Sequence, residues 1–274
     1  IGIRSFNSLN LAMSLISSGG FLPFNDISLI LNSDFKKIIF SFLMLISFFS
    51  IFFIYNLIFF KNRDKNFFYE DYHLLLYLVV LILIFFLFFS FNNNFINLIF
   101  SIFSSISNIG ISLEYNDNNL YFIFLLLTII GGSFFSTSSG LRLIRIYSLL
   151  KFSLNQVLSF SKPRNIFMNR LIFSKTNFEI NEINKYFLSI IIFIISLLVL
   201  TSLMTFSGVN FEKGLKISIL TLMNTVNSSN YGIADFDFLN IHFFSKYSLI
   251  LFMIIGRIEL LTLLLIIKKY LFKN

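Results

Sequence analysis

Three short runs of small and polar residues could bind a metal cation through their main chain. They read SSGGF at residues 17–21, SNIGIS at 107–112 and NSSNYG at 227–232, and each follows a short, partly apolar segment. Glycine accepts positive φ angles and lets backbones approach closely. A turn of this kind can expose backbone carbonyls that replace the water around a bare cation. Several such turns around one axis would form a cation filter.

The candidate filter residues come from all three turns. They are Ser18, Gly19 and Gly20 in the first, Asn108, Ile109 and Gly110 in the second, and Ser229, Asn230, Tyr231 and Gly232 in the third. Each turn taken singly could equally be a loop or a small-residue contact between helices. Their common place, after a short apolar segment and before a long one, favours the filter.

A further run of small residues interrupts the apolar stretch LLLTIIGGSFFSTSSGLRLIRI at 125–146. Such residues would let a membrane helix unwind into a loop whose hydroxyls and carbonyls face water. The alternative is a flexible kink in a packed helix, with Ser and Thr bonding back to the helix carbonyls. The candidate loop residues are Gly131, Gly132, Ser133, Ser136, Thr137, Ser138, Ser139 and Gly140.

Composition indicates that the chain is an integral membrane protein. The chain is 57% hydrophobic and only 12% charged, whereas soluble domains average about 25% charged residues. Without cysteine it has no disulfide or thiolate site, and its two histidines, His73 and His242, are far apart in sequence. The net charge of +8 does not indicate nucleic-acid binding, because the basic residues lie mainly between apolar segments, as the positive-inside rule predicts.

Apolar length predicts the membrane-crossing segments. A crossing helix needs about 20 residues, and the ranges 36–60, 73–91, 186–206 and 244–267 qualify, with the interrupted 119–146 as a fifth. Three stretches are too short or too polar to cross: 6–18, 95–106 and 213–226.

Basic clusters at 61–65, 142–185 and 268–273 indicate how often the chain crosses the membrane between them. If all three face the cytoplasm, each interval between them contains an even number of crossings. The short segment of each interval must then enter the membrane and return. This predicts an all-α integral membrane protein of repeated helix, re-entrant pore helix, helix units around a central ion pathway.

The predicted organisation has four parts. They are 1–60, a pore helix, filter turn and second helix; 61–146, a unit whose second helix is broken; 147–185, a cytoplasmic connection; and 186–274, the last unit. Because the first part lacks the opening helix of the other units, we expect a further segment before Ile1.

Four stretches give the chain a resemblance to the Trk/Ktr/HKT superfamily of potassium transporters, most closely the TrkH type. LAMSLISSGGF at 11–21 and NTVNSSNYG at 224–232 resemble filters. IGGSFFSTSSGLRLIRI at 130–146 resembles the broken helix, and LFMIIGRIELLTLLLI at 251–266 the last helix. The likeness extends over nearly the whole chain, as the C-terminal part of such a transporter.

The resemblance implies potassium uptake across the bacterial cytoplasmic (inner) membrane by a multi-pass subunit of a Trk system. Potassium would bind at the filter residues, and the intramembrane loop would be the gate. It further implies a homodimer and a cytosolic nucleotide-binding regulatory ring. Asn230 stands where the family usually has a filter glycine, which leaves the preference between potassium and sodium open.

Arg257 belongs to the predicted gate. A charge in the middle of an apolar span costs at least about 2.5–3.5 kcal/mol on insertion scales, so we expect this side chain to face the bundle or the pathway. Glu259 points to another side of the helix and is not its obvious partner. By resemblance Arg257 lies near the gate loop, where it would form an electrostatic barrier and hydrogen-bond loop carbonyls. A purely structural charge is the alternative.

Three function classes remain. The first is a cation-conducting subunit, for potassium or as a sodium-preferring or non-selective pore. The second is a non-conducting, truncated membrane scaffold. An intramembrane enzyme is the weakest, because the sequence has no Ser–His pair, paired Asp or metal-ligand set at a common depth and no phosphate-binding glycine loop.

Overall fold

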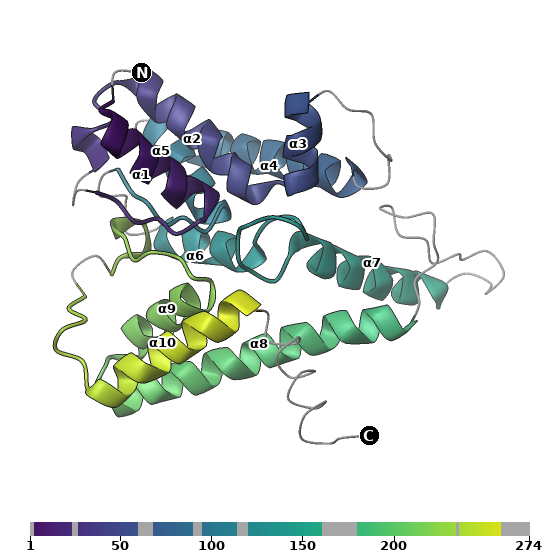
Figure 1. Ribbon diagram of the computed structural model, residues 1–274. Coiled ribbons are helices and arrows are strands. Elements are labelled where there is room, and N and C mark those ends of the chain that lie inside the picture. Colours follow the sequence, from purple (N-terminus) through teal and green to yellow (C-terminus); the bar gives the residue numbers. More distant parts are fainter. Residues whose placement is uncertain are drawn as a thin grey trace.

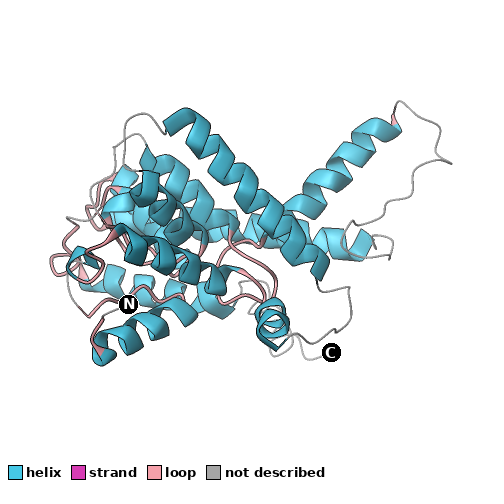
Figure 2. Cartoon of the chain, turned by 90° about the horizontal axis from the view of Figure 1, so that it is seen from above, coloured by secondary structure: helices cyan, strands magenta, loops and turns pink. Residues whose placement is uncertain are grey.

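The computed structural model describes residues 3–23, 27–59, 68–89, 95–113, 120–160, 180–233 and 236–258. Within these ranges the regular structure is entirely helical (Figure 2). The elements are α1 (Ser5–Ile16), η1 (Ile27–Leu29), α2 (Asp34–Phe48), α3 (Ile51–Phe59), α4 (Phe68–Phe89), α5 (Phe95–Ile106), α6 (Tyr121–Ile130), α7 (Leu143–Ser159), α8 (Ile180–Phe206), α9 (Phe211–Leu222), η4 (Ser229–Tyr231) and α10 (Phe243–Ile258).

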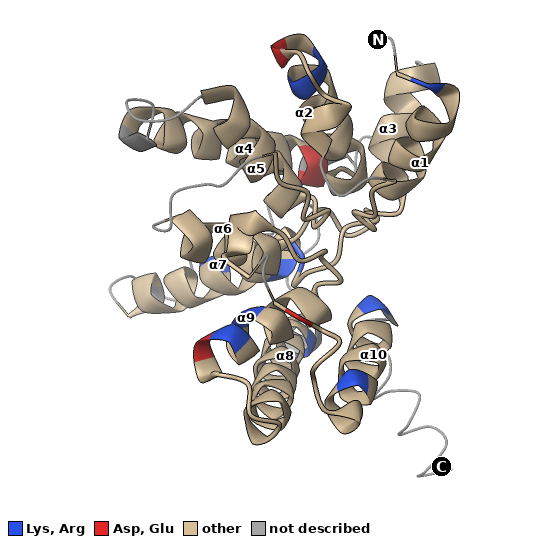
Figure 3. Ribbon diagram, turned by 90° about the vertical axis from the view of Figure 1, so that its left-hand side faces the viewer, with Lys and Arg blue, Asp and Glu red and all other residues tan. Residues whose placement is uncertain are grey.

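Two described helices are long and apolar enough to cross a bilayer. They contain Glu70–Leu87 of α4 and Ile183–Phe206 of α8. Both keep many large apolar side chains on the outside, among them Leu83 and Ile195, as lipid-facing helices do. In Figure 3 the helices carry few charged residues along their length. The all-α membrane architecture predicted from composition is confirmed.

The structure replaces the predicted single span over 36–60 with two helices. α2 and α3 meet at an angle of 120° around Phe49 and Ser50. The N–H and Oγ of Ser50 both donate to the carboxylate of Asp71, at 3.0 and 2.5 Å. Asp71 thereby satisfies donors that a continuous helix would have satisfied internally.

The three short helices, α1, α5 and α9, lie at the three stretches that the sequence marks as too short or too polar to cross. α5 is the most enclosed of them, and every residue from Ser101 to Ile106 is buried. It packs against α2 and α6, while α9 packs against α8, α10 and α6 (Figure 1). α5 is therefore enclosed by its neighbours, whereas α1 keeps Phe6, Leu9, Met13 and Ile16 on the outside.

Two helices and a loop occupy the segment 119–146. α6 ends at Ile130, α7 begins at Leu143, and the residues between them are not helical. This excludes the kinked-helix alternative.

Several predicted features lie outside the described residues. They are the basic clusters at 61–65 and 268–273, residues 161–179 of the cluster at 142–185, residues 259–267 of the last span, and Glu259.

Candidate functional site: converging turns and an intramembrane loop

The helices α1, α5 and α9 each end in the same backbone turn. Ser18, Asn108 and Asn224 follow α1, α5 and α9 with φ of 49°, 58° and 51°. Their N–H groups bond three residues back, to Leu15, Ser105 and Thr221. The next N–H, of Gly19, Ile109 and Thr225, bonds five residues back, to Ser14, Ser104 and Leu220. This is the Schellman arrangement, which satisfies the last carbonyls of a helix.

The turn by itself does not identify a site, because the long helix α8 ends in the same way at Gly208. What distinguishes the other three is their position. They end short helices from three distant parts of the sequence, and they meet one another in the interior. The partially negative ends of three helix dipoles therefore face one region.

Direct backbone contact joins the three turns. A Cβ placed on Gly20 would collide with the carbonyl oxygen of Ile109 and lie 2.9 Å from Cγ2 of Val226. A Cβ on Gly110 would collide with the carbonyl oxygen of Val226 and lie 2.8 Å from Cγ2 of Thr225. Both glycines have positive φ, 66° and 79°. Only glycine fits these two positions, because both the space and the conformation exclude a side chain.

The structure places Ser229, Asn230, Tyr231 and Gly232 outside this group of turns. Ser229–Tyr231 form the short helix η4, and Gly232 packs against the ring of Tyr121. Asn230 is fully buried, accepts from the hydroxyl of Ser101 at 3.2 Å and donates to the carbonyl of Ile111 at 3.3 Å. The turn geometrically equivalent to the other two is instead Asn224–Val226, five to six residues earlier in the chain.

Buried polar atoms without a described partner gather at the turns and the loop. Six of the ten such atoms in the described chain lie there: both amide atoms of Asn108, the hydroxyls of Ser133, Thr137 and Ser228, and Oδ1 of Asn227. Buried polar groups are normally hydrogen-bonded to protein or water. A concentration of neutral oxygens in an otherwise apolar protein is the chemistry that a partly dehydrated cation needs.

The loop 131–140 closes on itself. Gly131 and Gly140, with φ of 69° and 114°, lie against each other, and Leu141 N–H donates to Ile129 O at 3.0 Å. Within the loop, Ser138 Oγ accepts from Gly132 N–H at 3.0 Å. The chain therefore leaves α6, makes a compact excursion and returns to begin α7.

Main-chain hydrogen bonds tie this loop to the break between α2 and α3. Ser133 N–H donates to Phe48 O and Ser138 N–H to Ser47 O, both at 3.0 Å. In return Ile51 N–H donates to Phe135 O at 3.2 Å. Each non-helical segment thus satisfies backbone groups of the other.

Two acidic residues that sequence reasoning passed over support this arrangement. Glu70 accepts from Phe134 N–H at 2.7 Å, and its neighbour Asp71 holds Ser50 as described above. Their position in the first turn of a long apolar helix was the available signal, since two acids at the start of a membrane span need a partner.

Arg142 holds the loop from its other end. Its Nη1 donates to Ser133 O at 2.6 Å, to Ser136 O at 3.3 Å and to Ser136 Oγ at 3.0 Å. A single guanidinium therefore fixes the curvature of the loop between Ser133 and Ser136.

Arg257 joins the loop to the first turn. Its Nη1 lies 3.2 Å from Ser18 Oγ and 3.3 Å from Ser139 Oγ, and its Nη2 donates to Ser17 O at 3.0 Å. Ser18 Oγ in turn donates to Thr137 O at 2.9 Å. The predicted proximity of Arg257 to the loop is present, but the loop atom that it contacts is a hydroxyl and not a carbonyl.

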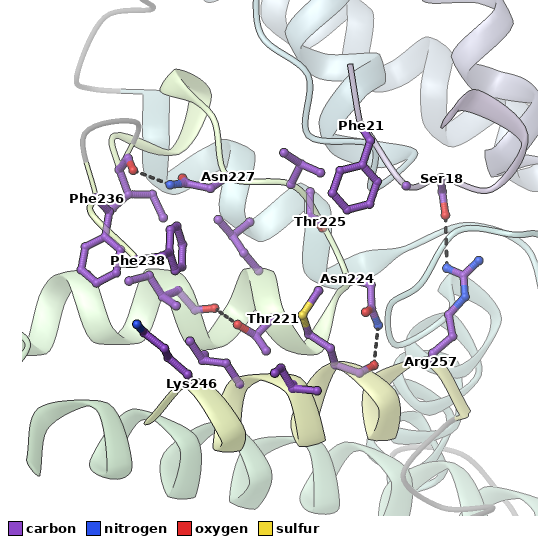
Figure 4. Close-up of a pocket in the computed structure, with 18 of the residues that line it drawn as sticks. Ser18, Phe21, Thr221, Asn224, Thr225, Asn227, Phe236, Phe238, Lys246 and Arg257 are labelled. Atoms are coloured by element: carbon purple, nitrogen blue, oxygen red, sulfur yellow. Dashed lines mark hydrogen bonds between the residues drawn. The ribbon is translucent and has the colours of Figure 1, made fainter. Parts of the chain in front are cut away.

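A cavity of about 870 Å³ opens between the first turn and the last unit. It is lined by Ser18 and Phe21 on one side, by Asn224 and Val226 of the last turn, and by Arg257 (Figure 4). Asn224 closes the base by donating from Nδ2 to Met253 O at 3.0 Å. The first turn, the last turn and Arg257 therefore border one space, and Arg257 links it to the loop through Ser139.

Comparison with known proteins supports the fold. No protein-family model matches the chain, and no curated protein matches its sequence. Among solved structures, the crystal structure of the potassium transporter TrkH from Vibrio parahaemolyticus superposes with a TM-score of 0.77 at 20% identity. The match covers 97% of this chain and 58% of that one, so the chain spans a little over half its length. The chain therefore has a TrkH-like fold.

Proposed function

We propose that this chain forms the pore of a Trk-type system that takes up potassium across the bacterial cytoplasmic membrane. The observation that carries the proposal is the convergence of three helix-ending turns, the first and last of which border one cavity with Arg257, a residue that also contacts the loop. The TrkH-like fold supports the same reading.

The turns supply the ion-binding chemistry. The carboxyl ends of α1, α5 and α9 face the region with partial negative charge, which attracts a cation. Carbonyl oxygens of the turns then take the place of water molecules around the ion. The filter that we propose consists of Ser18–Gly20, Asn108–Gly110 and Asn224–Val226. Potassium is the cargo and meets neutral oxygens throughout.

The loop 131–140 is the gate in this proposal. For it to move, its bonds to Ser47, Phe48 and Ile51 and the contact of Arg257 with Ser139 must be exchanged for others. The positive charge of Arg257 opposes a passing cation, so the closed arrangement combines a steric and an electrostatic barrier. Opening then requires coordinated movement of the loop and this side chain.

The assembly that we propose is a homodimer regulated by a cytosolic nucleotide-binding ring. These two partners follow from the resemblance of the sequence to Trk-type transporters. The cytoplasmic ends of α7 and α8 are the surface on which such a ring would act, because α7 continues directly from the loop.

One observation favours a second reading. The three turns touch one another, and Val226 lies between the first two. This suits a non-selective pore or a scaffold without transport.

The test is growth in low potassium of a bacterium without its own potassium uptake, expressing the complete gene. Wild type, Arg257→Ala and a deletion within 131–140 are compared, with Leu251→Ala as the control, an exposed residue of the same helix outside the cavity lining. Rescue by wild type and faster or leakier uptake in the first two variants support a potassium pathway gated by the loop. A well-expressed wild type that gives no rescue eliminates potassium uptake.

A further inference from the structure

The geometric match of the three turns identifies an unusual residue in the last one. Two positions after the residue with left-handed backbone, the first turn has Gly20 and the second has Gly110. The third has Val226, two positions after Asn224. One of three equivalent positions thus holds a branched side chain where the others have none.

The backbone changes with the residue. Gly20 and Gly110 have positive φ, whereas Val226 is not among the residues of positive φ in the described chain. A β-branched residue enters that region only with strain. The peptide groups around Val226 are therefore turned differently from their counterparts. The backbone of the last turn therefore departs from that of the other two at this position.

The side chain also occupies space. Cγ2 of Val226 lies 2.9 Å from the point where a Cβ on Gly20 would be, so its methyl fills the room that the missing side chain of Gly20 leaves. Val226 is partly exposed and lines the cavity beside Ser18 and Gly19. Its isopropyl group thus spans from the last turn to the first.

We infer that Val226 sets both the rate and the ion preference of this pathway, lowering cation flux and weakening the discrimination of potassium from sodium. The inference rests on the proposed function. Two separate properties of the Val226 side chain would produce these effects. The bulk of the side chain narrows the path, and its resistance to positive φ removes ligands from the ring of carbonyls.

Two substitutions separate the parts. Val226→Ala removes the methyl groups but keeps a Cβ that still disfavours positive φ. Val226→Gly removes both constraints. Val209→Gly is the matched control, since it makes the same change in the loop before α9. The full chain is purified, placed in vesicles and assayed for uptake of ⁸⁶Rb⁺ and ²²Na⁺, while calorimetry measures binding of K⁺ and Na⁺. Thermal unfolding shows that each variant is folded.

We expect Val226→Ala to raise the flux of both ions with little change in preference. Val226→Gly should raise the flux and also increase the preference for potassium about tenfold, which is the effect of about 1.4 kcal/mol. Val209→Gly should change neither quantity.

The ion flux of the wild type tests the proposed function. The change in the ratio of ⁸⁶Rb⁺ to ²²Na⁺ uptake between wild type and variants tests the inference about Val226. Strong potassium preference in the wild type, unchanged in a folded Val226→Gly protein, overturns the inference and leaves the proposed function standing. If the wild type transports neither ion but Val226→Gly gains potassium binding, the proposed function is overturned and the inference about Val226 stands. Neither transport nor binding in any variant overturns both.

Discussion

Replacing Asp71 by alanine is expected to destabilise the break between α2 and α3 severely. The side chain is 1% exposed and accepts two hydrogen bonds, from the N–H and Oγ of Ser50. Its removal leaves two buried donors without a partner, at about 1–3 kcal/mol each. The sum is roughly 2–6 kcal/mol, which lowers Tm by about 4 °C or more in a chain of this size.

The assay is thermal unfolding of purified protein in detergent, combined with a double-mutant cycle. Ser50→Ala removes one of the two bonds, so the double variant should be more stable than the sum of the single effects predicts, by about 1–2 kcal/mol. Asp34→Ala is the matched control. Its carboxylate is exposed and pairs with Lys37 at 3.7 Å, and such a pair contributes at most about 1 kcal/mol.

Two results would refute this reasoning. If Asp71→Ala unfolded at the same temperature as Asp34→Ala, Asp71 would not hold the break. If the effects of Asp71 and Ser50 were simply additive, the hydrogen bonds between them would carry none of the stability.

Three further predictions concern the turns, the helix packing and the loop. Gly20→Ala should abolish uptake, since its Cβ would collide with Ile109, while Gly214→Ala, whose nearest neighbour is 3.5 Å away, should not; uptake assays at matched expression compare them, and equal activity would contradict the contact. Gly256→Ala should lower Tm, because its Cβ would collide with Leu222 O between α10 and α9; an unchanged Tm would show that the helices separate without cost. Arg142→Gln should raise basal uptake by releasing Ser133 and Ser136, with Lys151→Gln on the same helix as control; unaltered leak would mean that the loop keeps its shape without the guanidinium.

Most of the fold follows from apolar length. The bounds of α5 coincide with the predicted segment 95–106, and those of α1 and α9 lie within four residues of prediction, whereas α4 and α8 begin five and six residues earlier than predicted. The non-helical run at 131–140 was also predictable, because glycine and serine weaken a helix at a stretch too long to be a simple turn.

The break at Phe49–Ser50 was not predictable from its own residues. Neither glycine nor proline marks it, and its causes, Asp71 and the loop, lie at least twenty residues away in sequence. Tertiary hydrogen bonds override local helix preference here.

The register of the last turn was missed for a different reason. Reasoning from glycine led to Gly232, but the left-handed position after α9 is occupied by Asn224. Asparagine tolerates that conformation. The useful signal was the asparagine at equivalent places in two turns, Asn108 and Asn224, and not the glycine.

The exchange of hydrogen bonds between the α2–α3 break and the loop has a consequence for how such a protein can evolve. A substitution that straightened α2 and α3 into one helix would redirect Ser47 O and Phe48 O to intrahelical partners, and Ser133 and Ser138 would lose their acceptors. A change that made residues 131–140 helical would do the same to Ile51. Neither break can be repaired in a single step, so the two irregular segments should be inherited and lost together.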